Sequence, residues 1–210
     1  MITLNVPYLN NEYIASVADS FLKNNKLISI PINIEYIIES NYRMDIIPLP
    51  SLKMAFDIDG FSTSDFNEIC VDQFVYEQRY YRFRFTLAHE LGHKIMHQEY
   101  ISKLKFSSIA EWKNVVDQLD PSDHSKMEYQ ANVFAGMVLV PRAFLRIEFK
   151  GQLRLLEAQI EQARSNRLSR DDYLHTVLYE ISNNLIPKFE VSMDVLARRI
   201  EFECLKKEIR

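Results

Sequence analysis

The residues with the clearest capacity for chemistry are the five from His89 to His93, which read His-Glu-Leu-Gly-His. Residues four apart on a helix share a face, so the imidazoles of His89 and His93 could bind one zinc ion. Glu90 would lie beside them, close enough to take a proton from a water at the metal. With five histidines in the chain, chance produces this HExxH pattern in roughly one such chain in a hundred. The motif therefore predicts a zinc-dependent hydrolytic site.

The residues around the motif predict a helix with two chemically different sides. At about 100° per residue, His89, His93 and His97 fall in one narrow sector. The other half of the helix is apolar and holds Leu87, Ala88, Leu91, Gly92, Ile95 and Met96. Burial of that half would hold the imidazoles rigidly, as a metal site requires. A solvated helix with incidental histidines is the alternative, and the motif and its flanks together disfavour it.

A catalytic zinc usually has three protein ligands and an open position for water, so a third ligand is needed. His97 is one candidate, but it lies eight residues from His89, which is about 12 Å of helical rise. Zinc–nitrogen bonds are only about 2 Å long, so a straight helix cannot bring both rings to one ion. We therefore expect His97 to support the site from outside the coordination shell or to lie at the helix end.

A second predicted helix, around residues 128–136, carries a better third ligand. Glu128 and Asn132 share a face with the small residues Ala135 and Gly136, which favours close packing on another helix. Such packing would deliver the Glu128 carboxylate to zinc, and Asn132 could accept a hydrogen bond from a ligand imidazole. The alternative is an ordinary amphipathic helix with a surface Glu, which the HExxH motif makes the weaker interpretation. His124, one turn earlier, could approach the metal, but we expect it at the surface.

Two stretches of the chain together resemble the ImmA/IrrE family of metallopeptidases. Residues 84–93 read RFTLAHELGH, residues 128–135 read EYQANVFA, and Leu139-Val140-Pro141 follows. The family pattern is an FTxAHELGH helix followed by an ExxANxFA helix that ends near a proline. The likeness spans roughly residues 30–145 and is sharp only at these two helices, with Gly136 and Val138 as mild variants.

The resemblance implies a zincin-like fold, with zinc on His89, His93 and Glu128 and with Glu90 as the general base. Tyr129 or His97 could supply a further donor to the oxyanion. The resemblance also implies an endopeptidase that cuts a helix-turn-helix repressor and so switches on mobile-element or stress genes. Two other functions stay open: a non-catalytic regulator that binds a helix-turn-helix partner, and a component of a toxin–antitoxin pair.

Composition limits the class of protein further. A net charge of −4 gives no general attraction to nucleic acid, so direct nucleic-acid binding is not expected. Cys70 and Cys204 are too few for a disulfide framework and suit a reducing compartment. Residues 1–8 do not read as a signal peptide, and no apolar run is long enough to cross a membrane. We expect a cytoplasmic protein.

The hydrophobic periodicity predicts an α+β fold, in which a small antiparallel or mixed sheet precedes the motif helix and the C-terminal region is mostly helical. We expect a zincin-like domain over residues 1–145 and a helical extension over 146–210, packed on or beside the core. The expected strands are 45–49, 54–58 and 68–72, with the strand around 68–74 at the sheet edge. The expected helices are 10–26, 32–40, 77–96, 108–119, the helix carrying Glu128, 142–149, 152–165, 170–184 and 192–207.

Overall fold

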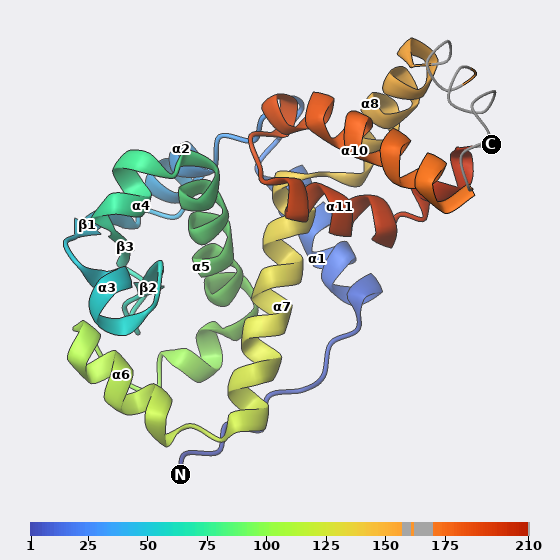
Figure 1. The fold of residues 1–210 in the computed structure, drawn as a ribbon. Helices are drawn as coiled ribbons and strands as arrows, with labels where there is room; N and C mark the ends of the chain where they lie inside the picture. The colour runs from blue at the N-terminus through green and yellow to red at the C-terminus, as the bar shows by residue number, and fades with distance from the viewer. Residues whose placement is uncertain (157–160, 162–169, 210) are drawn as a thin grey trace. The chain divides into compact units, whose positions relative to one another are not determined.

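The computed structural model describes residues 1–156, 161 and 170–209. These residues form two compact units. The first comprises Met1–Ile28 and Asn33–Val138, and the second comprises Ser29–Ile32 and the described residues from Leu139 on. The expected domain boundary near residue 145 stays a prediction, as does the packing of the C-terminal helices. The α+β class is confirmed, because a three-stranded sheet and many helices make up the fold (Figure 1).

The sheet of the first unit is mixed, with the order β1-β3-β2. Its strands are β1 (Asp45–Leu49), β2 (Gly60–Ser62) and β3 (Glu68–Asp72). Strand β3 pairs parallel with β1 and antiparallel with β2. Our expectation that β3 is an edge strand is therefore wrong. Residues 69–72 are all buried, and an unbroken buried run is typical of a central strand covered on both faces.

The strand expected at residues 54–58 is also wrong, because α3 (Leu52–Phe56) occupies this place. The Asp72 carboxylate accepts a hydrogen bond from the Lys53 backbone N–H at 2.8 Å, which satisfies a donor of the first helical turn. Met54, which falls within the expected strand, is 85% exposed. A short apolar run has no period that separates a strand from one helical turn.

The helix that carries the HExxH motif is α5 (Tyr80–Ile101), preceded by the short α4 (Gln73–Gln78). The single helix expected over residues 77–96 is thus interrupted at Arg79, whose backbone angles are not helical. The residues at the break are Gln78, Arg79 and Tyr80. None of them is a glycine or proline, so the sequence does not mark where the helix is interrupted. Asp72 caps α4 by accepting from the Val75 N–H at 3.1 Å, which stabilises a separate start for that helix.

The other expected helices of the first unit are confirmed. Ser108 and Glu111 form a reciprocal capping box at the start of α6, which accounts for where that helix begins. The remaining helical elements are α1 (Asn11–Asn24), α2 (Ile34–Tyr36) with the π-helical turn η1 (Ile37–Asn41), α6 (Ile109–Gln118) and α7 (Pro121–Leu139).

Helices α5 and α7 lie side by side, as the green and yellow ribbons show in Figure 1. Gly92 makes the approach close, because a Cβ atom there would lie 3.1 Å from Phe134 Cδ1 and 3.3 Å from Ala131 Cα. We expected small residues on the helix of Glu128 to allow such packing. Ala131 is the small residue at this contact. It allows α5, which carries the HExxH motif, to pack closely against α7, which carries Glu128.

The second unit is helical, as expected, in the residues that the structure describes. Gly151 does not interrupt α8 (Arg142–Leu155), so this one helix holds residues 142–149 and the start of the expected helix 152–165. Most of that second segment lies outside the described residues. Arg199 is buried and pairs with Glu203 at 2.9 Å. The elements are α8 (Arg142–Leu155), α10 (Arg170–Phe189), α11 (Met193–Phe202) and the 3-10 turn η2 (Leu205–Glu208).

None of the helices in the described part of the chain is both long enough and apolar enough to cross a lipid bilayer.

Candidate metal centre

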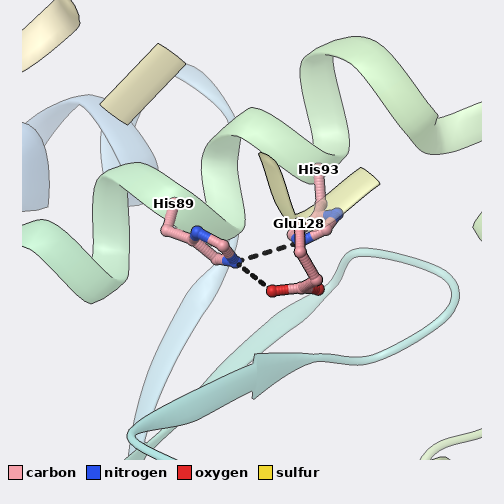
Figure 2. Close-up of side chains that lie close together, drawn as sticks. All are labelled: His89, His93 and Glu128. Atoms are coloured by element: carbon pink, nitrogen blue, oxygen red, sulfur yellow. Dashed lines mark hydrogen bonds and ion pairs between the residues drawn. The ribbon is translucent and has the colours of Figure 1, made fainter. Parts of the chain in front are cut away.

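Three potential ligands from two helices converge at one point (Figure 2). His89 and His93 come from adjacent turns of α5, and Glu128 comes from α7. The Nε2 atoms of His89 and His93 lie 3.0 Å apart. Each Nε2 is 3.3 Å from a different carboxylate oxygen of Glu128. The close packing at Gly92 is what allows α7 to bring its carboxylate this near to α5.

These separations fit a divalent metal ion. Bonds of about 2 Å at tetrahedral angles place zinc ligands about 3.3 Å from one another. The observed ligand atoms, at 3.0 and 3.3 Å, lie close to this spacing. Two imidazole nitrogens and one carboxylate are also a donor set that zinc accepts readily. The residues His89, His93 and Glu128 could therefore hold one metal ion.

The electrostatics of the three groups favour a cation between them. Burial acts to raise the pKa of Glu128, but its interactions with the imidazoles of His89 and His93 outweigh burial, and the pKa is lowered. Glu128 is therefore a carboxylate at neutral pH. Burial likewise acts to lower the pKa of His89, but the Glu128 interaction and the charge of Glu90 raise it. The raised pKa of His89 reflects the negative charge of Glu128 and Glu90, whereas the lowered pKa of Glu128 reflects its two imidazole neighbours.

Glu90 lies next to this cluster and is held by a residue from the sheet. Its side chain is largely buried, and its Oε2 accepts a hydrogen bond from Ser62 Oγ at 2.8 Å. Ser62 ends β2, a strand absent from the predicted set, so this partner of Glu90 was not predicted either. A serine in a loop-rich region carries no signal of its own. Only the pairing of β2 with β3 places its hydroxyl at the general-base candidate.

His97 lies outside the ligand cluster, on the far side of His93. Its Nδ1 is 3.1 Å from Nδ1 of His93, and its Nε2 is 2.8 Å from Oε1 of Gln130. His97 is 1% exposed. Burial lowers its pKa to about 3, so His97 is neutral at physiological pH. Gln130, the partner of His97, was not predicted from the sequence. A single glutamine within a helix belongs to no motif that would mark it as part of a site.

The remaining polar candidates lie at different distances from the centre. Asn132 helps to raise the pKa of His89, so it lies beside that ring, and it lines the same cavity. His124, expected at the surface, is partly buried, and its Nε2 lies 3.7 Å from Oε1 of Glu128. Tyr129, considered as an oxyanion donor, is instead 45% exposed and donates to Asn11 Oδ1 at 2.7 Å.

A cavity of about 330 Å³ opens onto the site. Its lining includes the ligand cluster, Glu90 and the edge strand from Gly60 to Ser62. Trp112 of α6 also lines the cavity and packs against Phe61 of that strand, with ring centroids 6.0 Å apart. Further apolar lining comes from Phe106, Val115, Val116, Leu119 and Met127. A polar ligand cluster beside apolar side chains suits a chain segment with one apolar side chain.

The fold and the site together are those of a zincin-like metallopeptidase. The family model described as IrrE N-terminal-like domain, of the M78 peptidases, matches residues 43–201. Because the match covers well over half of the 210 residues, the chain belongs to this family, and the ImmA/IrrE resemblance is confirmed. A search of curated proteins finds no match. The chain is accordingly a metallopeptidase, and it acts on protein substrates.

Proposed function

We propose that this protein is a zinc-dependent endopeptidase that cleaves a helix-turn-helix repressor or antitoxin in the cytoplasm and thereby derepresses the genes under its control. One observation carries the proposal: His89, His93 and Glu128 converge to within ligand distance of one another, with Glu90 fixed beside them. A purely structural metal site has no need of a buried carboxylate next to its ligands. Membership of the M78 peptidases supports the same reaction class.

His89 and His93 would hold zinc through Nε2, and Glu128 would hold it through its carboxylate. Zinc in such a site supplies a Lewis acid that polarises a carbonyl group and makes water more acidic. Asn132 and His97 would orient the imidazoles from outside the coordination shell, Asn132 by accepting a hydrogen bond from His89 and His97 through its contact with His93.

Glu90 would be the general base and then the general acid of the reaction. Its carboxylate accepts a proton from the attacking water, whose oxygen forms the new bond to the scissile carbonyl carbon. The same proton is then passed to the leaving nitrogen as the peptide bond breaks, so Glu90 ends the cycle as a carboxylate. The Ser62 hydroxyl holds Oε2, which fixes the orientation of the carboxylate for both transfers.

The cavity walls indicate how a substrate would lie. Strand β2 is an edge of the sheet and lines the cavity, so an extended peptide could pair with its backbone. The apolar side chains around Trp112 would then receive a side chain next to the scissile bond. We expect a cleavage site with an apolar residue at that position, in a segment that can become extended.

The test is a cleavage assay on the helix-turn-helix protein encoded nearest to this chain. Zinc-loaded wild type should cut it once, beside an apolar residue identified by mass spectrometry of the fragments. The Glu90→Gln variant removes the proton acceptor but no ligand, so it should bind zinc and leave the substrate intact. Binding without cleavage by the wild type would instead indicate a non-catalytic regulator. Cleavage by Glu90→Gln at the wild-type rate would remove Glu90 from the mechanism.

A further inference from the structure

A line of three buried side chains runs from His93 away from the ligand cluster and ends at a backbone carbonyl. Nδ1 of His93 lies 3.1 Å from Nδ1 of His97, and Nε2 of His97 lies 2.8 Å from Oε1 of Gln130. Nε2 of Gln130 then donates to the carbonyl oxygen of Pro7 at 2.8 Å. The three side chains belong to residues that are 7%, 1% and 1% exposed, respectively, so water does not substitute for these partners.

The carbonyl of Pro7 fixes the direction of every hydrogen bond in this line. A carbonyl oxygen only accepts, so Gln130 must face it with the amide nitrogen. The amide oxygen of Gln130 is therefore turned to His97, and Nε2 of His97 must carry the proton. The reversed amide would place two acceptor oxygens 2.8 Å apart, which is repulsive.

The same reasoning determines the proton on His93. If His97 carries its proton on Nε2, its Nδ1 is an acceptor, so Nδ1 of His93 must donate. Nε2 of His93 is then without a proton, and this is the atom that faces His89 and Glu128. A second proton on His97 would set two N–H groups against each other at 3.1 Å. It would force the proton of His93 onto Nε2, where a metal ligand must have none.

We propose that Gln130 and His97 are positioning residues that select the metal-binding tautomer of His93, with the Pro7 carbonyl as the fixed end of the line. The segment that contains Pro7 is itself anchored on α7, since the Asp123 carboxylate accepts from the backbone N–H of Leu4, Asn5 and Val6 at 2.8, 2.9 and 3.1 Å. The proposal rests on the assignment of His93 as a metal ligand.

The direct test is the tautomeric state of the histidines in the zinc-loaded wild-type protein, read by two-bond ¹H–¹⁵N NMR correlations of the imidazole rings. We expect His97 to be neutral with its proton on Nε2, and His93 to have its proton on Nδ1. A proton on Nδ1 of His97, or protons on both nitrogens, would overturn the proposal. This measurement needs no variant, so it does not depend on how any substitution folds.

A second test compares two buried glutamines. Gln130→Met removes the hydrogen bonds and keeps the side-chain length, so it should weaken zinc binding in a chelator competition about tenfold or more. Gln152 is 5% exposed and bonds to Asn184 in the second unit, so Gln152→Met should leave zinc affinity within about twofold. Equal zinc affinity in Gln130→Met and wild type would contradict the positioning role.

Failure of this proposal differs from failure of the proposed function. A wild type that binds zinc and cleaves its substrate, but has His97 in the other tautomer, would overturn the positioning role alone. A wild type that binds no zinc through His93 would overturn both the positioning role and the proposed endopeptidase.

Discussion

At the scale of single residues, the candidate base is restrained from one side and the ligands from another. Ser62 reaches Glu90 from the sheet, whereas Gln130 and His97 reach His93 from behind. Each of these contacts fixes one rotamer of a group that must be placed to within a fraction of an ångström. The site is therefore rigid before a substrate enters, which lowers the cost of organising it during catalysis.

Ser62→Ala tests the restraint on Glu90. The substitution removes the hydroxyl that donates to Oε2 at 2.8 Å, so we expect kcat to fall about tenfold with zinc content unchanged. Steady-state kinetics and metal analysis measure the two effects. Ser64→Ala is the matched control, because Ser64 is equally buried but accepts from the Phe106 N–H instead. Wild-type kcat in Ser62→Ala would show that Glu90 needs no such partner.

Site residues that a single helix positions can be predicted from the sequence, whereas those that contacts between elements position cannot. His89, Glu90 and His93 follow from helical spacing alone, because one helix positions all three. Glu128 lies on a second helix, and only the HExxH motif makes it a better candidate than an ordinary surface glutamate. Ser62 and Gln130 reach the site only through the pairing of strands and the packing of helices, and no local period of the sequence encodes those contacts.

At the scale of elements, the distance between α5 and α7 determines whether the ligands can meet. Gly92 lies where the two helices are closest. Glu128 is less than one turn from Ala131 on α7, so a shift of α7 at this contact moves the carboxylate as well.

Gly92→Ala tests this spacing. The new Cβ would lie 3.3 Å from the Cα of Ala131, and a backbone atom cannot rotate aside, so the helices must separate slightly. We expect a loss of about 1 kcal/mol in the free energy of unfolding and zinc affinity weakened several-fold, measured by urea denaturation and chelator competition.

Gly151→Ala is the control for Gly92→Ala, because nothing lies within 4 Å of a Cβ at Gly151 in the middle of α8. Alanine is the better helix former by roughly 1 kcal/mol, so this variant should gain stability. A similar gain in Gly92→Ala, with zinc affinity intact, would show that the helix contact tolerates a methyl group.

The elements also show where periodicity is informative. Long helices such as α1 and α7 were predictable because several turns repeat the same pattern. Strand β2 and helix α3 are only three and five residues long, which is too short for a period to appear. The strand order β1-β3-β2 depends on which apolar strand has a partner strand on each side. Those partners are set by tertiary packing, which the local sequence pattern does not show.

At the scale of the whole molecule, the N-terminal segment is bound to α7 through several side chains, and the Asp123 carboxylate is one of them. Asp123 accepts three backbone N–H groups and lies within 3.4 Å of Lys126 Nζ. Burial acts to raise the pKa of Asp123, but these hydrogen bonds outweigh burial and lower it below 3.8. A lowered folded-state pKa means that the charged form stabilises the fold above about pH 4, and that this contribution is lost as the pH falls further.

Asp123→Asn should therefore cost about 2 kcal/mol of unfolding free energy at pH 7, and the difference from wild type should shrink below about pH 4. Urea midpoints across this pH range measure it. Asp117→Asn is the control, because Asp117 pairs with Lys113 at the surface and should change stability by less than about 0.5 kcal/mol. A difference between Asp123→Asn and wild type that grows toward acid would contradict the sign of the shift.

The most direct test of the central claim is the zinc content of purified protein by mass spectrometry, for wild type, Glu128→Ala and Glu90→Gln. If His89, His93 and Glu128 bind one ion and Glu90 does not, wild type and Glu90→Gln should carry about one zinc per chain. Glu128→Ala should carry almost none after brief dialysis. Full zinc occupancy in Glu128→Ala would contradict the account, because the carboxylate from α7 would then not be a ligand.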